Sequence, residues 1–280
     1  MNPKIAMVQS ETFFGENEAE INMGRAEKYI DEAADQGANI ICFPESFPGP
    51  WKQPIAYSPK ERMARKAAER KVYVIFGDLE EVGEKNGDCY NVLWFVGPDG
   101  KVIGKYRRTT PLGPWVYKGG NHWDFNYVTG DELQVFDTEF GKVGILMCSE
   151  AYSPELSRIL TLKGAEIIFL PAGTPGYNWH ETWGTLIKAR AYENLAYTGV
   201  CRNMFGSEAT DGLCIIAGPE GPLLEAHTCG VFTATLDMDR LRFLRASKDG
   251  PNPPVPWKVK PGQPHQWRRP ELCEELTKIR

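Results

Sequence analysis

The stretch Lys142–Cys148 reads Lys-Val-Gly-Ile-Leu-Met-Cys, and it echoes the stretch Lys4–Ser10, which reads Lys-Ile-Ala-Met-Val-Gln-Ser. A second pair matches in the same way: Gly37–Pro44 reads Gly-Ala-Asn-Ile-Ile-Cys-Phe-Pro, and Gly164–Pro171 reads Gly-Ala-Glu-Ile-Ile-Phe-Leu-Pro. Short apolar runs bounded by glycine or proline are typical of buried strands. Because a helical pattern separates the two strands of each half, the chain is predicted to contain two similar β–α–β halves. Chance similarity between buried strands is the alternative.

Two such halves, each with an apolar sheet and covering helices, are expected to pack sheet against sheet. The sequence therefore predicts an α/β fold, a four-layer α-β-β-α sandwich, formed by a single domain over residues 1–247. Helix-start signals support the outer layers: Asn17 with Glu20 makes a capping signature, and the stretch Ser58–Glu61 combines a serine cap with an early proline and acid. Residues 248–280 are rich in proline and are predicted to form an extended tail that wraps the body or contacts a partner subunit.

The composition is that of an ordinary globular chain: 280 residues, 42% hydrophobic and 25% charged, with a formal net charge of −5. Lys and Arg are scattered, which argues against nucleic-acid and anionic-membrane partners. No apolar run approaches the roughly 20 residues of a membrane span, and no secretory signal is expected. Seven cysteines without a close-paired motif fit reduced thiols in a cytoplasmic protein. Neither zinc-like spacing nor a phosphate-binding glycine motif occurs, so no metal or cofactor is expected.

Cys148 closes a predicted buried strand, and the helix-start signal Ser153–Glu155 follows it five residues later. The carboxyl end of a strand is where open α/β folds bind their ligands. A nearby helix N-terminus is also expected to favour a thiolate. Position thus makes Cys148 a candidate nucleophile, and the alternative is a small buried hydrophobic residue.

Glu45 marks the corresponding strand end in the first half, because the similarity between the two halves ends there. Glu45 corresponds to Ala172 in the second half, and Cys148 corresponds to Ser10 in the first. Each half would then donate one reactive residue to a common site. Glu45 projects into an apolar, proline-stiffened turn, and a carboxylate whose charged form is disfavoured by burial suits a general base for a thiol. The alternative is a carboxylate satisfied by backbone amides of its own turn.

At this point the sequence resembles the nitrilase, or carbon–nitrogen hydrolase, superfamily. The motifs that carry the resemblance run in order along the chain up to about Ala246 and are Phe43–Glu45, Gly104–Arg108, Gly144–Glu150, Arg190–Asn194, Gly212–Gly221 and Leu236–Asp239. The resemblance implies a four-layer α-β-β-α sandwich that forms homodimers or larger homo-oligomers. It also implies a Glu-Lys-Cys triad that acts on amides, nitriles or carbamoyl compounds without a cofactor.

Carried over residue by residue, the resemblance makes Cys148 the nucleophile and Glu45 the general base. The position of the family lysine holds Arg108, which keeps the positive charge but cannot deprotonate. Lys105 lies three positions earlier and is expected on the opposite face of its strand. A further family glutamate has no direct match, and Asp124 is the candidate to replace it.

The implied chemistry is a hydrolysis through a Cys148 thioester. Arg108 and the backbone N–H of Ser149 would hold the developing negative charge, while Glu150 is expected to orient neighbouring groups. Carbamoyl-amino-acid members of the family often carry a carboxylate-binding arginine at the position of Tyr152, so a carboxylate held in that way is not expected here.

Three further aromatic residues, Trp115, Trp123 and Trp179, are expected to line a pocket for a small-molecule substrate together with Tyr152. The alternative is that these tryptophans only fill space in the packing of the loops. An amide is favoured over a nitrile. Two other functions remain open on the sequence alone. The thioester could pass its acyl group to an acceptor other than water, or the chain could be a non-catalytic ligand-binding homologue, for which Arg108 is the best support.

Overall fold

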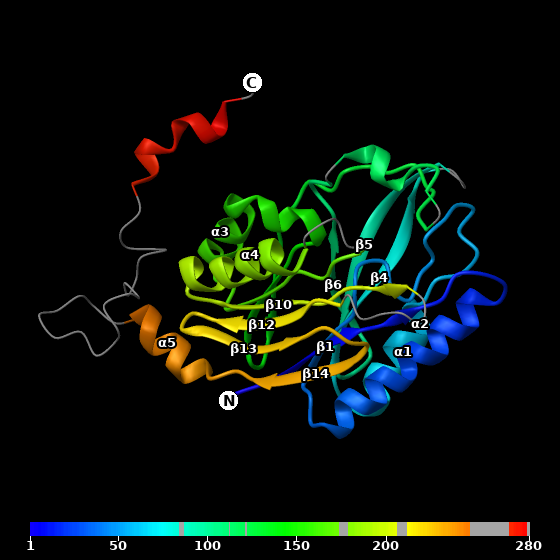
Figure 1. The fold of residues 1–280 in the computed structure, drawn as a ribbon, viewed down its shortest axis with the longest axis horizontal. Coiled ribbons are helices and arrows are strands. Elements are labelled where there is room, and N and C mark those ends of the chain that lie inside the picture. Colours follow the sequence, from blue (N-terminus) through cyan, green and yellow to red (C-terminus); the bar gives the residue numbers. More distant parts are fainter. Residues whose placement is uncertain are drawn as a thin grey trace, which may run out of the picture.

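The computed structural model describes residues 1–83, 87–111, 113–120, 122–173, 179–205, 212–246 and 269–278. The part of the predicted tail at 248–268 lies outside the described residues, so its extended conformation stays a prediction. Of the rest of the tail, residues 270–277 form two short 3-10 turns (Figure 1).

Two sheets of six strands each form the centre of the described chain (Figure 1). The first sheet contains, in spatial order, β14 (Gly230–Thr235), β1 (Lys4–Gln9), β3 (Ile40–Cys42), β4 (Tyr73–Val82), β5 (Asp88–Val96) and β6 (Val102–Arg107). The second contains β13 (Gly221–Ala226), β12 (Cys214–Gly218), β10 (Tyr197–Val200), β9 (Ile167–Phe169), β8 (Gly141–Ile145) and β7 (Val135–Thr138). A separate two-stranded ladder joins β2 (Glu11–Thr12) to β11 (Met204–Phe205).

The two halves that the sequence predicted have the same strand pairing. β1 pairs with β3 in parallel, and β8 pairs with β9 in parallel. Each pair continues into a third parallel strand, β4 in the first sheet and β10 in the second. The echo in the sequence therefore corresponds to equivalent positions in the two sheets.

Helices cover the outer face of each sheet and complete the predicted four layers (Figure 1). The helices α1 (Glu18–Asp35) and α2 (Lys60–Arg70) pack on the first sheet, and α3 (Pro154–Leu162) and α4 (Trp179–Asn194) on the second, with α5 (Met238–Ala246) at the end of the domain. The start signals act differently from expectation. Asn17 is the N-cap of α1 but makes no side-chain cap bond. The Ser58 hydroxyl accepts the Lys60 N–H at 3.3 Å, yet its shorter bond is to Asp78, at 2.7 Å.

Alternation along β1 shows how one strand serves two cores. Ile5 and Met7 belong to the core between the two sheets, whereas Ala6 and Val8 face the core under α1 and α2. Successive side chains of a strand point to opposite faces, and both faces of this sheet are covered, so the strand is apolar throughout.

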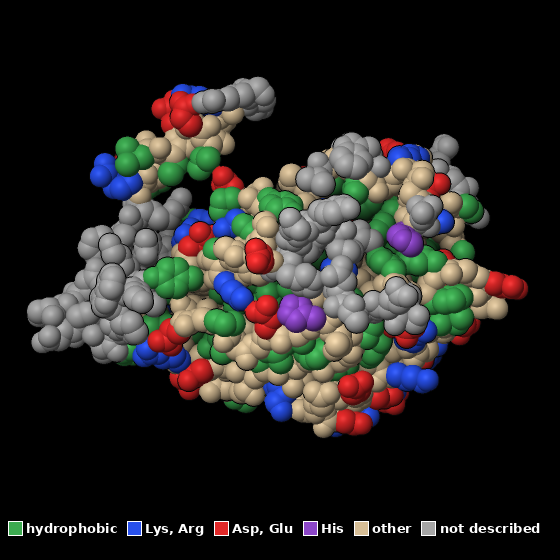
Figure 2. Space-filling model, viewed as in Figure 1, with side chains coloured by type: hydrophobic (Ala, Val, Ile, Leu, Met, Phe, Trp, Pro, Cys, Tyr) green, Lys and Arg blue, Asp and Glu red, His purple; other side chains and the backbone are tan. Residues whose placement is uncertain are grey.

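The surface carries charges of both signs. On the face shown in Figure 2, Lys and Arg side chains of the described residues are interspersed with Asp and Glu. None of the described helices combines the length and the apolar character needed to cross a membrane.

Candidate active site

The three residues expected to act on the substrate follow strand ends of both sheets and lie together: Arg108 pairs with Glu45, and both act on the pKa of the Cys148 thiol. Glu45 comes three residues after β3, Arg108 directly after β6, and Cys148 three residues after β8. Glu45 and Arg108 are each only 2% exposed. Burial of two charged groups is tolerated when they pair and when their remaining atoms find hydrogen bonds.

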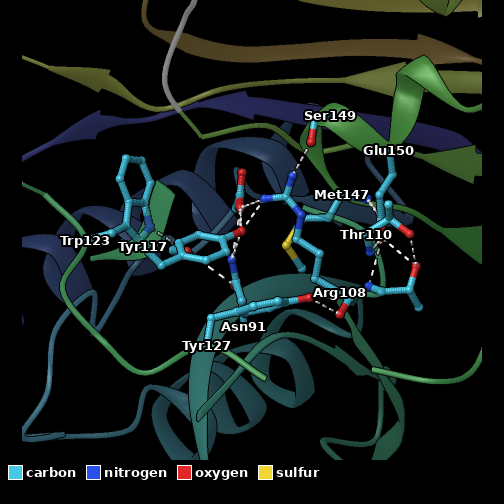
Figure 3. Close-up of polar contacts among 12 residues, drawn as sticks. Asn91, Arg108, Thr110, Tyr117, Trp123, Tyr127, Met147, Ser149 and Glu150 are labelled. Carbon is cyan, nitrogen blue, oxygen red and sulfur yellow. Dashed lines mark hydrogen bonds and ion pairs between the residues drawn. The ribbon is translucent and has the colours of Figure 1, made fainter. Parts of the chain in front are cut away.

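Arg108 links the two halves of the fold. Its Nη1 lies 2.6 Å from Glu45 Oε1, and its Nη2 donates to Ser149 Oγ at 2.6 Å, next to Cys148 (Figure 3). Burial alone would lower the pKa of Arg108, but Tyr117, Glu45 and Cys148 raise it, and the net shift is upward. The guanidinium is therefore a fixed cation that spans the site, a geometry that the fork of an arginine permits and the single ammonium of a lysine does not.

Three residues that the sequence did not single out complete the surroundings of Glu45. Its Oε1 accepts hydrogen bonds from Asn91 Nδ2 and from the Tyr117 hydroxyl, each at 2.9 Å. Its backbone carbonyl accepts from Asn203 Nδ2 at 2.7 Å. Other elements thus supply the side chains that hold the carboxylate, which differs from a carboxylate bonded to its own turn.

Cys148 begins a 3-10 turn with a left-handed backbone, φ 53°. Non-glycine residues in this region carry strain that is common at functional sites. Burial raises the pKa of the Cys148 thiol to about 12, Glu45 adds to the rise, and Arg108 and the Gly173 N–H oppose it. The expectation that the following helix favours a thiolate was therefore wrong, because burial and the adjacent carboxylate outweigh it. At neutral pH the thiol is protonated, so its attack on a substrate needs a base.

Gly173 connects the thiol to the carboxylate. Its N–H donates to Cys148, and a Cβ built on it would lie 2.9 Å from Glu45 Oε2 and 3.1 Å from the Trp123 ring. The Trp123 Nε1 in turn donates to Ser46 Oγ at 3.1 Å, which fixes the ring beside the glycine. The backbone at Gly173 is close to both groups, and no space for a side chain remains.

We expect Gly173→Ala to lower kcat/KM for any hydrolysed substrate by about 10²-fold, since small displacements of reacting groups cost roughly that much. The added methyl would push Glu45 or Trp123 away from Cys148. Steady-state kinetics, with a thermal melt to verify folding, measure the effect. Gly24→Ala, inside α1 at a position where no atom lies within 4 Å of the added Cβ, is the control; equal activity of the two variants would contradict the expectation.

Glu150 orients the site, as expected. It is fully buried, and its oxygens accept from the backbone N–H groups of Met147, Thr109 and Thr110 at 2.7 to 2.9 Å and from the Tyr106 hydroxyl at 2.7 Å. One carboxylate thereby ties the segment after Arg108 to the segment before Cys148.

Arg190 supports the same turn from the helix behind it. Its Nε and Nη2 donate to the Ala151 carbonyl at 3.2 and 3.0 Å, and its Nη1 pairs with Glu193 at 2.8 Å. Glu193 therefore holds the Arg190 side chain and has a structural role. The turn that carries Cys148 is therefore held from both sides.

The other charged residues considered in the sequence, Asp124 and Lys105, do not join the cluster of Glu45, Arg108 and Cys148. The structure does not bring Asp124 to the cluster: its side chain is exposed and accepts the Gly119 N–H at 3.0 Å, because the loop turns this carboxylate outward. Lys105 pairs with Glu80 on the opposite face of β6, as expected.

Among the aromatic candidates, Tyr152 is 48% exposed, and its hydroxyl accepts from Trp183 Nε1 at 2.8 Å. The side chains of Trp115 and Trp179 lie outside the described residues.

No cluster of three or more His, Cys, Asp or Glu side chains suited to a metal ion occurs in the described part of the chain. The groups that the structure brings together are a thiol, a carboxylate and a guanidinium. Such a set can transfer protons and stabilise negative charge around a covalent intermediate.

Comparison with known proteins gives a consistent picture. The family model "Carbon-nitrogen hydrolase" matches residues 4–246. The chain is 28% identical over 244 residues to a deaminated glutathione amidase of Synechocystis sp., covering 80% of this chain and 89% of the relative. It is also 28% identical over 276 residues to an N-carbamoylputrescine amidase of Arabidopsis thaliana, covering 86% of this chain and 89% of the relative.

Solved structures share the fold. Nit3 of Saccharomyces cerevisiae, described as a member of branch 10 of the nitrilase superfamily, superimposes with a TM-score of 0.73 at 22% identity, covering 87% of this chain and 93% of that one. An amidase from Nesterenkonia sp. gives a TM-score of 0.72 at 22% identity, covering 87% and 94%. The chain therefore belongs to the carbon–nitrogen hydrolase family and is an enzyme of the nitrilase superfamily, acting on carbon–nitrogen bonds other than peptide bonds.

Proposed function

We propose that this enzyme hydrolyses a small-molecule amide through a thioester on Cys148, with Glu45 as the general base and Arg108 in the role of the family lysine. One observation carries the proposal: Arg108 binds Glu45 at 2.6 Å through one nitrogen and Ser149, the neighbour of Cys148, at 2.6 Å through another. Relatives named as amidases support an amide substrate.

The first chemical step forms the thioester. Glu45 takes the thiol proton as the Cys148 sulfur attacks the amide carbon, and the carbonyl oxygen becomes an oxyanion. Arg108 and the backbone N–H of Ser149 stabilise that oxyanion; one such donor contributes about 2.7–4 kcal/mol in other acyl-transfer sites. Glu45 then gives its proton to the departing nitrogen, so ammonia or an amine leaves.

Water cleaves the thioester in the second step. Glu45, now ionised again, takes a proton from water as the oxygen attacks the thioester carbon. It then passes that proton to the departing Cys148 sulfur, so the acid and the Cys148 thiol are released and Glu45 is again ionised. Because an arginine does not deprotonate in proteins, Arg108 moves no proton in either step. All proton transfers therefore pass through Glu45.

A panel of aliphatic and aromatic amides, with nitriles of the same acyl groups, tests the proposal. We expect ammonia release from amides and slower or no release from nitriles. Hydroxylamine added as an acceptor separates the alternatives: hydroxamate formed much faster than acid indicates acyl transfer as the main activity. A folded enzyme that yields neither ammonia nor hydroxamate from any compound would contradict the proposal and favour a non-catalytic binding protein.

A further inference from the structure

The Tyr117 hydroxyl lies between the two charged groups of the site. It donates to Glu45 Oε1 at 2.9 Å, accepts from Arg108 Nη1, and accepts from Asn91 Nδ2 at 3.0 Å (Figure 3). A phenol has one O–H to donate and two lone pairs to accept with. All three are used, so the two incoming donors force the hydroxyl hydrogen toward Glu45.

Tyr117 remains a neutral phenol in this position. Burial raises its pKa well above the ordinary value, Arg108 opposes the rise and Glu45 adds to it. The groups whose charge acts on its pKa are Arg108, Glu45 and Cys148, and the titratable phenol of Tyr127 packs on its ring. A neutral phenol cannot accept a proton as a carboxylate does, but it can hold the Glu45 carboxylate in place by a hydrogen bond.

The Tyr117 ring is fixed as firmly as its hydroxyl. It is only 2% exposed and stacks on Phe125 with ring centroids 4.7 Å apart, and Tyr127 packs on it at 5.1 Å. The Phe125 N–H also bonds to the Tyr117 carbonyl at 2.9 Å. Rigid packing around a side chain that touches a reacting group is what a preorganised site requires.

From this geometry we propose that Tyr117 is a positioning residue for catalysis: it holds Oε1 of Glu45 so that the carboxylate is presented to the Cys148 thiol. The second oxygen, Oε2, lies against Gly173, whose N–H binds the thiol. Tyr117 touches no reacting atom of the substrate and acts through Glu45 and Arg108. The inference rests on the proposed function, which assigns Glu45 as the base.

Tyr117→Phe is the direct test, with Tyr197→Phe as the matched control. The Tyr197 hydroxyl is also hydrogen-bonded, to the Asp237 carbonyl at 2.9 Å, but it is remote from the site. We expect Tyr117→Phe to lower kcat about 10- to 100-fold with little change in KM, because a hydrogen bond to a charged group is lost. The acidic limb of the kcat/KM profile should move to higher pH, since a donor to the charged carboxylate is gone. Tyr197→Phe should match the wild type.

A second substitution keeps the ring and the hydroxyl in case Tyr117→Phe does not fold. Fluorotyrosine at position 117 lowers the pKa of the phenol and makes it a stronger donor, so the acidic limb should move to lower pH. Shifts in opposite directions for the two substitutions support positioning. Unchanged kcat and pH profile in either folded variant, with only the melting temperature altered, would overturn it.

Alkylation of Cys148 by iodoacetamide, followed by mass spectrometry against pH, supplies a readout without turnover. If the wild type hydrolyses no amide, the proposed function fails, yet the alkylation profile still decides the inference. A profile displaced by Tyr117→Phe but not by Tyr197→Phe supports it, and identical profiles refute it.

Discussion

Replacing Cys148 by alanine is expected to abolish amide hydrolysis while leaving the fold intact. Removing the nucleophile of a catalytic set that acts as a unit costs on the order of 10⁶-fold in kcat. The alanine keeps the Cβ, and the backbone bond from the residue 148 N–H to the Pro171 carbonyl, 2.9 Å long, does not depend on the thiol. Ammonia release measures the loss, and a thermal melt close to that of the wild type shows that the turn is preserved.

Two further measurements sharpen this test. Cys273→Ala removes an exposed thiol outside the domain core and should leave activity unchanged. Rapid quenching of the wild type during turnover should reveal, by mass, an acyl group on Cys148 that is absent from the alanine variant. Hydrolysis that survives in Cys148→Ala would show that another group attacks the amide and would remove the basis of the proposed mechanism.

Most of the fold could be predicted because its signals are local. The apolar runs that became β1, β3, β8 and β9 are bounded by glycine and proline, and their repetition indicated two equivalent halves. β7 was not predicted. Its four residues, Val135–Thr138, show no periodicity of their own, and pairing with β8 makes them a strand. Tertiary pairing of this kind overrides weak local preference.

The site was predictable only where residues follow strand ends or match family motifs. Glu45, Arg108 and Cys148 meet both conditions. Asn91 lies inside β5 and Tyr117 in a short 3-10 turn, where each residue resembles an ordinary packing residue. Their roles arise from contacts with Glu45 across 46 and 72 positions of the sequence.

The assignment of Asp124 failed for a related reason. A carboxylate was sought in the loop because the resemblance implies one, but residue type does not determine which side chain of a loop turns inward. The structure turns Tyr117 inward and leaves Asp124 exposed. The group that contacts both Arg108 and Glu45 is a phenol, which no search for acidic residues would find.

Arg108→Gln is expected to damage both stability and catalysis. Removing one partner of a buried ion pair leaves the other charge uncompensated, at a cost of about 3–5 kcal/mol of unfolding free energy. The variant also lacks the cation that faces the oxyanion, for which a loss of about 10²–10³-fold in kcat is expected. Chemical denaturation and steady-state kinetics measure the two effects separately.

Arg107→Gln is the matched control, because the two arginines are adjacent but point to opposite faces of the sheet. Arg107 pairs with Glu80 at 2.8 Å with 35% of its side chain exposed, whereas the Arg108 side chain is 3% exposed. A partly exposed pair contributes only about 0–1 kcal/mol, so this control should remain stable and active. Similar behaviour of the two variants would mean that the buried pair organises neither the fold nor the reaction.

Arg108→Lys separates charge from shape in the same experiment. Lysine restores a cation beside Glu45, so we expect most of the stability lost in Arg108→Gln to return. A single ammonium cannot reproduce the fork that binds Glu45 through Nη1 and Ser149 through Nη2, both at 2.6 Å. Catalysis should therefore recover less than stability does. If the lysine variant instead equals or exceeds the wild type in kcat, the planar fork has no catalytic function and the positive charge alone suffices.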